Sequence, residues 1–126
     1  EENTKAFLNV MKNSMVKILG HIDNTQYPVD YDAVVKAAGE NGVLLEMNEA
    51  SLAPYGYRGD TRSNCAEILR CCRKYLVPIV LSSDSHGAEH IGDFTYVADF
   101  VHQAMFPEAL ILNNQIPKLK MILSMR

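Results

Sequence analysis

Three side chains in this sequence have the chemistry of metal ligands and stand close after short apolar stretches. They are His21, Asp84 and His86. Neutral imidazole and carboxylate are ligands that zinc, manganese and iron take in proteins. In an extended segment, residues two apart point to the same side, so Asp84 and His86 could serve one ion or two neighbouring ions. The pattern predicts a metal site. The open alternative is that Asp84 forms a turn, that His86 is a surface histidine, and that His21 is an exposed histidine or one with protein partners.

Two further residues are candidates for contact with a substrate. Asn48 follows the strand-like residues 43–47, and the adjacent Glu49 could support a ligand or touch substrate itself. Arg58 stands between glycines in residues 55–59, where its guanidinium could bind a phosphate through two parallel hydrogen bonds. We predict Asn48 and Arg58 as substrate-binding residues, with a solvated surface arginine as the alternative for Arg58.

The elements that must position these residues alternate between helical and extended patterns. Strands are predicted over residues 16–19, 43–47, 78–82 and 110–113, and helices over residues 4–12, 30–40, 61–75, 93–105 and 117–124. This order predicts an α/β fold of about four βα units with parallel strands. The carboxyl ends of parallel strands face a shared rim, so the candidate residues should meet there.

Composition excludes several classes of protein. The 126 residues carry a net charge of −3 and are 48% hydrophobic, which is typical of one globular unit. This charge gives no reason to expect binding to nucleic acid, and no stretch is long and apolar enough to predict a membrane helix. Three cysteines form an odd set that favours a reducing cytoplasm, and the helical spacing of Cys65 and Cys72 predicts packing instead of catalysis.

Four segments resemble the PHP (polymerase and histidinol phosphatase) family, and within it the YcdX-type phosphatases. Residues 20–38 are similar to the family segment that carries a metal-binding histidine, although this chain reads His-Ile-Asp where the relatives read His-Pro-Gly. Residues 44–51 resemble the family's L-E-I-N-N-S-S strand, residues 81–86 its G-S-D-S-H signature, and residues 91–94 its L-G-D-F turn. Order and spacing are kept over about residues 15–125.

The resemblance implies a fold and a metal site. Members of the family are distorted (βα)7 TIM-like barrels with a trinuclear site of zinc, manganese or iron, and they hydrolyse phosphate esters. By resemblance, His21 is a ligand of one metal, Asp84 of a second and His86 of a third. The family's opening H-x-H motif and further ligands lie in an N-terminal half that is absent here. Residues 1–126 are therefore expected to form the C-terminal portion of such a barrel domain.

These considerations give one main hypothesis and two alternatives. The intact protein is expected to be a metal-dependent phosphoesterase acting on a small phosphate ester, and this fragment alone is expected to be inactive because it keeps one ligand per metal. The alternatives are a non-catalytic binding or oligomerisation module on a partial barrel, and a metal-dependent amidohydrolase or nuclease. The strand at residues 16–19 would have an open edge, which predicts self-association.

Overall fold

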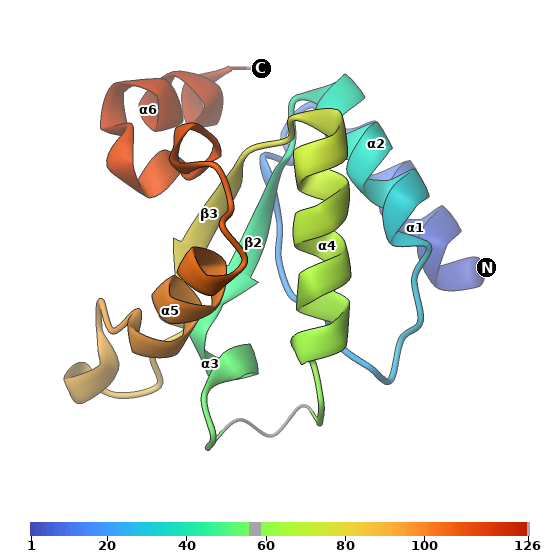
Figure 1. The fold of residues 1–126 in the computed structure, drawn as a ribbon. Coiled ribbons are helices and arrows are strands. Elements are labelled where there is room, and N and C mark those ends of the chain that lie inside the picture. The colour runs from blue at the N-terminus through green and yellow to red at the C-terminus, as the bar shows by residue number, and fades with distance from the viewer. Residues whose placement is uncertain (56–58, 126) are drawn as a thin grey trace.

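Three parallel strands lie at the centre of the computed structural model, which describes residues 1–55 and 59–125 (Figure 1). They are β1 (Ile18–Leu19), β2 (Leu44–Asn48) and β3 (Ile79–Ser82), in the order β1-β2-β3. Leu19 is in register with Leu45, which is in turn in register with Ile79. The predicted α/β class with parallel strands is confirmed at this level.

Helices separate the strands along the chain. The α-helices are α1 (Glu2–Val10), α2 (Tyr31–Asn41), α3 (Glu49–Leu52), α4 (Arg62–Tyr75), α5 (Thr95–Gln103) and α6 (Ile116–Ser124). The 3₁₀ turns are η1 (Ala88–His90), η2 (Glu108–Leu110) and η3 (Leu112–Asn114). Figure 1 shows α4, α2 and α1 on one side of the strands and α6 at the upper left. In the described part of the chain, none of the helices has both the length and the apolar character needed to span a membrane.

The start and end of α2 follow from local chemistry. The side chain of Asp30 accepts a hydrogen bond from the backbone N–H of Ala33 at 3.1 Å, which satisfies one of the unpaired amides of the first turn. At the other end, Gly42 adopts a left-handed conformation with φ of 65°, which glycine adopts without steric cost. These two signals fix the helix that follows the loop carrying His21.

The helical stripe that carries Cys65 and Cys72 faces the core, as predicted, except at its end, where Leu76 is the C-cap of α4 and is 72% exposed. Cys65, Cys71 and Cys72 are buried in α4, and Ile68 and Leu69 are buried with them. The helix packs against α2, and both cover the face of the sheet to which Leu45 and Met47 belong. A buried stripe at this spacing stabilises the helix through tertiary packing more than through intrinsic propensity.

The predicted fourth strand at residues 110–113 is wrong. The segment forms the turns η2 and η3, and only Ile111 makes an isolated bridge, to Ile79. The side chain of Asn113 lies against Leu81 instead: its amide nitrogen donates to the Leu81 carbonyl at 2.9 Å, and its oxygen accepts from the Leu81 N–H at 2.7 Å. A side chain thus occupies the positions that the backbone of a neighbouring strand would take. The structure also contains a short helix, α3, between residues 47 and 61, where no helix was predicted.

Alternation along the strands gives the sheet a second face. On this face Leu44, Val80 and Leu112 form a small apolar cluster against Leu119 and Ile122 from the region of α6. Further toward the carboxyl ends, the same alternation places polar residues on this face. The second face is therefore apolar at the start of the strands and polar at their end.

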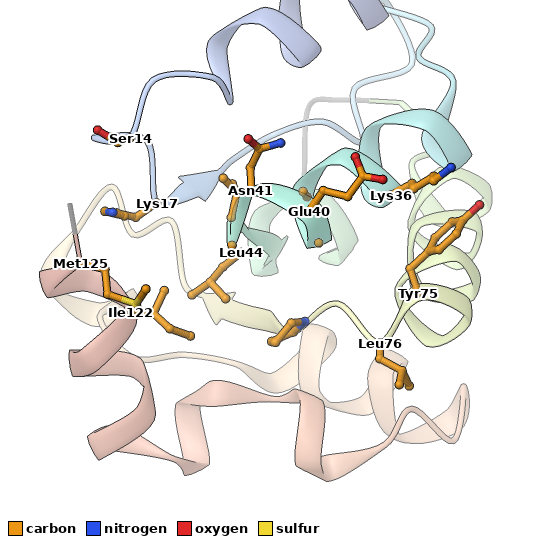
Figure 2. Close-up of a pocket in the computed structure, with 15 residues that line it drawn as sticks. Ser14, Lys17, Lys36, Glu40, Asn41, Leu44, Tyr75, Leu76, Ile122 and Met125 are labelled. Atoms are coloured by element: carbon orange, nitrogen blue, oxygen red, sulfur yellow. The ribbon is translucent and has the colours of Figure 1, made fainter.

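A groove of about 610 Å³ opens at the amino ends of the strands (Figure 2). Its lining includes Lys17, Leu44 and Pro78, which lie at or just before the three strand starts, together with Ile122 and Met125. His21 and Asp84 follow the opposite ends of their strands. The groove is therefore separate from the predicted site.

Candidate functional site

Polar side chains at the carboxyl ends of the three strands form a hydrogen-bonded group around Glu46. Glu46 Oε2 accepts the backbone N–H of His21 at 3.0 Å, two residues after the end of β1. Glu46 Oε1 accepts the hydroxyl of Ser82 at 2.5 Å and the side-chain amide of Asn48 at 3.4 Å. One carboxylate on the middle strand thus binds donors associated with all three strand ends.

His21 and Asp84 lie beside each other at this rim. The distance from His21 Nε2 to Asp84 Oδ2 is 3.7 Å, and the side chains are 45% and 22% exposed. Donors on one tetrahedral zinc ion are separated by about 3.4 Å, because each bond is about 2.1 Å long. An imidazole nitrogen and a carboxylate oxygen at this separation fit one shared divalent ion with a small adjustment, or two neighbouring ions about 3.5–4 Å apart. The donor set is therefore compatible with the predicted metal site.

Asn48 connects Asp84 to Glu46. Its amide nitrogen donates to Asp84 Oδ2 at 3.2 Å as well as to Glu46, and its oxygen accepts the N–H of Ser51 at 3.2 Å in α3. The residue is 2% exposed. The structure therefore gives Asn48 the role of holding the carboxylate of Asp84, and its contact with substrate stays a prediction.

His86 is exposed, and its ring is held by its own loop. Nδ1 lies 2.9 Å from the carbonyl oxygen of Asp84, and a proton on Nδ1 leaves Nε2 as the nitrogen able to bind a metal. Arg58 lies outside the described residues. Within residues 1–55 and 59–125, no three His, Cys, Asp or Glu side chains gather closely enough to hold one ion.

Sequence reasoning gave Glu46 and Ser82 no role in the site. A signal for Glu46 was present, because it lies two residues before Asn48 in a strand and such residues share a face. The hydrogen-bond partners of Glu46 on the neighbouring strands could not be predicted from the sequence. Its hydrogen bonds to His21 and Ser82 join residues 25 and 36 positions apart.

Glu49 has a structural role. Its side chain is 1% exposed, and its two oxygens accept the backbone N–H groups of Tyr96 at 2.9 Å and Val97 at 2.7 Å. These amides belong to the first turn of α5, where a negative charge also interacts favourably with the helix dipole. The Glu49 side chain thus links the start of α3 to the start of α5, the helix that follows the loop carrying Asp84.

The loop after His21 is held by buried groups. The hydroxyl of Tyr31 donates to the carbonyl of Ile22 at 2.8 Å, and burial raises the pKa of Tyr31 to about 12, so the phenol remains a donor at neutral pH. Asp23 is buried, and its Oδ2 lies 3.6 Å from Cys65 Sγ. Burial and the charge of Asp23 raise the pKa of the Cys65 thiol, which agrees with the predicted packing role.

The amino-acid sequence is similar to those of known proteins over most of its length. No model of a known protein family matches it. A probable phosphatase of Clostridium acetobutylicum is 42% identical over 119 residues, which are 94% of this chain and 48% of that protein. A probable phosphatase of Shewanella halifaxensis is 38% identical over 126 residues, all of this chain and 50% of that protein. The chain spans about half the length of these relatives, and over that half it is similar to proteins named as probable phosphatases.

Proposed function

We propose that this chain is part of a metal-dependent phosphoesterase of the PHP type, with His21, Asp84 and His86 as metal ligands. The observation that carries the proposal is the 3.7 Å approach of His21 Nε2 to Asp84 Oδ2 at the carboxyl ends of parallel strands. The similarity to probable phosphatases supports phosphate esters as the substrate class. Arg58 and Asn48 are the residues that we propose for substrate contact.

The ligand types suit zinc, manganese or iron, and a trinuclear site is the arrangement that the family resemblance implies. Bound metal would lower the pKa of a water molecule and neutralise charge on the phosphate. Catalytic zinc usually takes about three protein ligands. We therefore propose that the remaining ligands come from outside this chain, as expected if the relatives' other half completes the site.

We also infer that the three strands are part of a TIM-like barrel. The side of β2 that carries Leu45 and Met47 packs on α2 and α4. The other side is apolar at its start, where Leu44 packs near α6, and polar at its end. In barrels the inward side chains pack in layers, and the active site lies at the carboxyl ends of the strands. On this side of β2, the apolar Leu44 lies at the amino end and the polar Glu46 and Asn48 lie toward the carboxyl end, which supports this arrangement.

The proposal is tested by zinc titration and by hydrolysis of p-nitrophenyl phosphate with the 126-residue chain. We expect weak zinc binding and almost no turnover, because the chain supplies too few ligands for each ion. High activity from this chain alone would contradict the need for further ligands. Absence of any zinc binding would contradict the metal site and favour a non-catalytic module.

We further propose that the chain self-associates with a second copy through the edge of β1. In the described residues β1 has only β2 as a neighbour, and side chains around it are exposed: Ile18 is 40% and Met15 is 70% exposed. The relatives have about as much additional sequence as this chain contains, so a half of similar size is available to cover this edge in them. An open, apolar strand edge favours pairing with another chain.

Light scattering after size-exclusion chromatography should therefore give a mass above the 14.1 kDa of one chain. Ile18→Lys should shift the population toward the monomer, because a charge at an edge strand disfavours pairing. Ile91→Lys is the matched control, since Ile91 is 75% exposed in the loop before α5. A parent chain that is monomeric at all concentrations contradicts this proposal.

A further inference from the structure

Glu46 is the residue through which the ends of all three strands are connected. Its Oε2 accepts the N–H of His21 at 3.0 Å, and its Oε1 accepts from Ser82 at 2.5 Å and from Asn48 at 3.4 Å. A Cβ atom on Gly20 would lie 3.0 Å from Glu46 Oε2, so glycine allows the close approach. The carboxylate is thus placed tightly against the backbone that leads into His21.

Two of the three residues proposed as ligands have backbone conformations that need support. His21 has φ of 58° and Asp84 has φ of 46°, in the left-handed region that costs free energy for residues with a Cβ atom. The hydrogen bond to Glu46 restrains the N–H of His21 directly. The side-chain amide of Asn48 donates to both Glu46 and Asp84. The carboxylate of Glu46 therefore also restrains Asp84, through Asn48.

We propose that Glu46 is a positioning residue that sets the relative placement of His21 and Asp84. It acts through the His21 backbone and through Asn48, while its own oxygens are engaged by Ser82, Asn48 and His21. The consequence for metal binding rests on the proposed function, because it requires His21 and Asp84 to be ligands. The restraint on the His21 backbone does not depend on that function and can be measured without metal.

The first experiment measures backbone amide exchange by NMR in the metal-free chain. Glu46→Gln keeps the size of the side chain but removes its charge and presents one NH₂ group to the surrounding donors. We expect amide exchange at His21 to accelerate about tenfold or more, because its hydrogen bond to a charged carboxylate is replaced by a weaker one to a neutral amide oxygen or is lost. Exchange in α2 and α4 should not change. Unchanged exchange at His21, or equal acceleration throughout the chain, would overturn the proposal.

Two variants separate this role from general loosening of the sheet. Ser82→Ala removes the hydrogen bond between Ser82 and Oε1 of Glu46 but leaves Oε2 of Glu46 on His21, so exchange at His21 should stay near that of the parent chain. Glu40→Gln makes the same change of charge at an exposed residue of α2 and should have no effect at His21. Acceleration at His21 in either variant equal to that of Glu46→Gln would contradict a specific role for Glu46.

The second experiment titrates the parent chain and Glu46→Gln with cobalt(II) and follows visible absorption. Loss of a hydrogen-bond partner behind a metal ligand typically lowers metal affinity about 10–100-fold, and we expect a decrease in this range with an altered spectrum. Equal affinity and spectra would overturn positioning of the ligands by Glu46. If the parent chain binds no cobalt, the proposed metal site fails, and amide exchange alone decides whether Glu46 positions His21.

Discussion

Asp84→Asn should lower the affinity of the chain for zinc by more than about 100-fold, because loss of even a partner behind a ligand typically costs about 10–100-fold. Asparagine has the same shape as aspartate and tolerates the left-handed φ of 46° at this position. The amide of Asn48 can still donate to the remaining oxygen. The substitution therefore removes the charged ligand beside His21 with little change to the fold, and competition with a chromophoric chelator measures the effect.

Asp99→Asn is the control for this prediction. Asp99 lies on α5, where its carboxylate accepts a hydrogen bond from Gln103 at 2.8 Å, and it has no proposed part in the site. It changes the net charge by the same amount and should leave zinc affinity unchanged. Equal zinc affinity of Asp84→Asn and the parent chain would remove Asp84 from the proposed ligands.

Glu49→Gln should lower the free energy of unfolding by about 2–4 kcal/mol. Two backbone amides at the start of α5 lose a charged acceptor, and a hydrogen bond to a charged group contributes about 1.5–3 kcal/mol. The glutamine oxygen can satisfy one amide, while its NH₂ group faces the other. Since the total stability of a domain is about 5–15 kcal/mol, the loss should move the urea midpoint clearly.

Glu108→Gln makes the same change at an exposed carboxylate and should leave the midpoint nearly unchanged. The effect of Glu49→Gln should also appear locally, as faster amide exchange at Tyr96 and Val97. A midpoint equal to that of the parent chain would show that these two amides do not depend on Glu49.

Much of the local structure could be predicted because its causes are local. The cap at Asp30 and the glycine at position 42 fix α2 within a few residues of chain, and the apolar spacing in α4 shows which face is buried. The apolar stretches predicted β1, β2 and β3 to within two residues at either end. From parallel strands it followed that His21 and Asp84 would share a rim, and the structure brings them together.

The fourth predicted strand shows where such reasoning ends. Residues 110–113 have a β-prone composition, but a strand needs a partner along its length. The side chain of Asn113 takes the hydrogen bonds of Leu81, and the backbone on either side turns into η2 and η3. Strand propensity depends only on the residues of the segment itself. The backbone groups of Leu81, which bind the Asn113 side chain instead of a neighbouring strand, lie 32 residues away in the sequence.

The sequence by itself determined the five longer helices, the three strands of the sheet and which residue types arrive at the strand ends. Only the tertiary structure decided that Glu46 connects those ends and that Glu49 caps α5. Both depend on register and packing between segments 25 to 48 residues apart, which no local pattern encodes. A carboxylate on a strand has the same sequence signature whether it meets a metal, a helix start or solvent, and its neighbours in space determine its role.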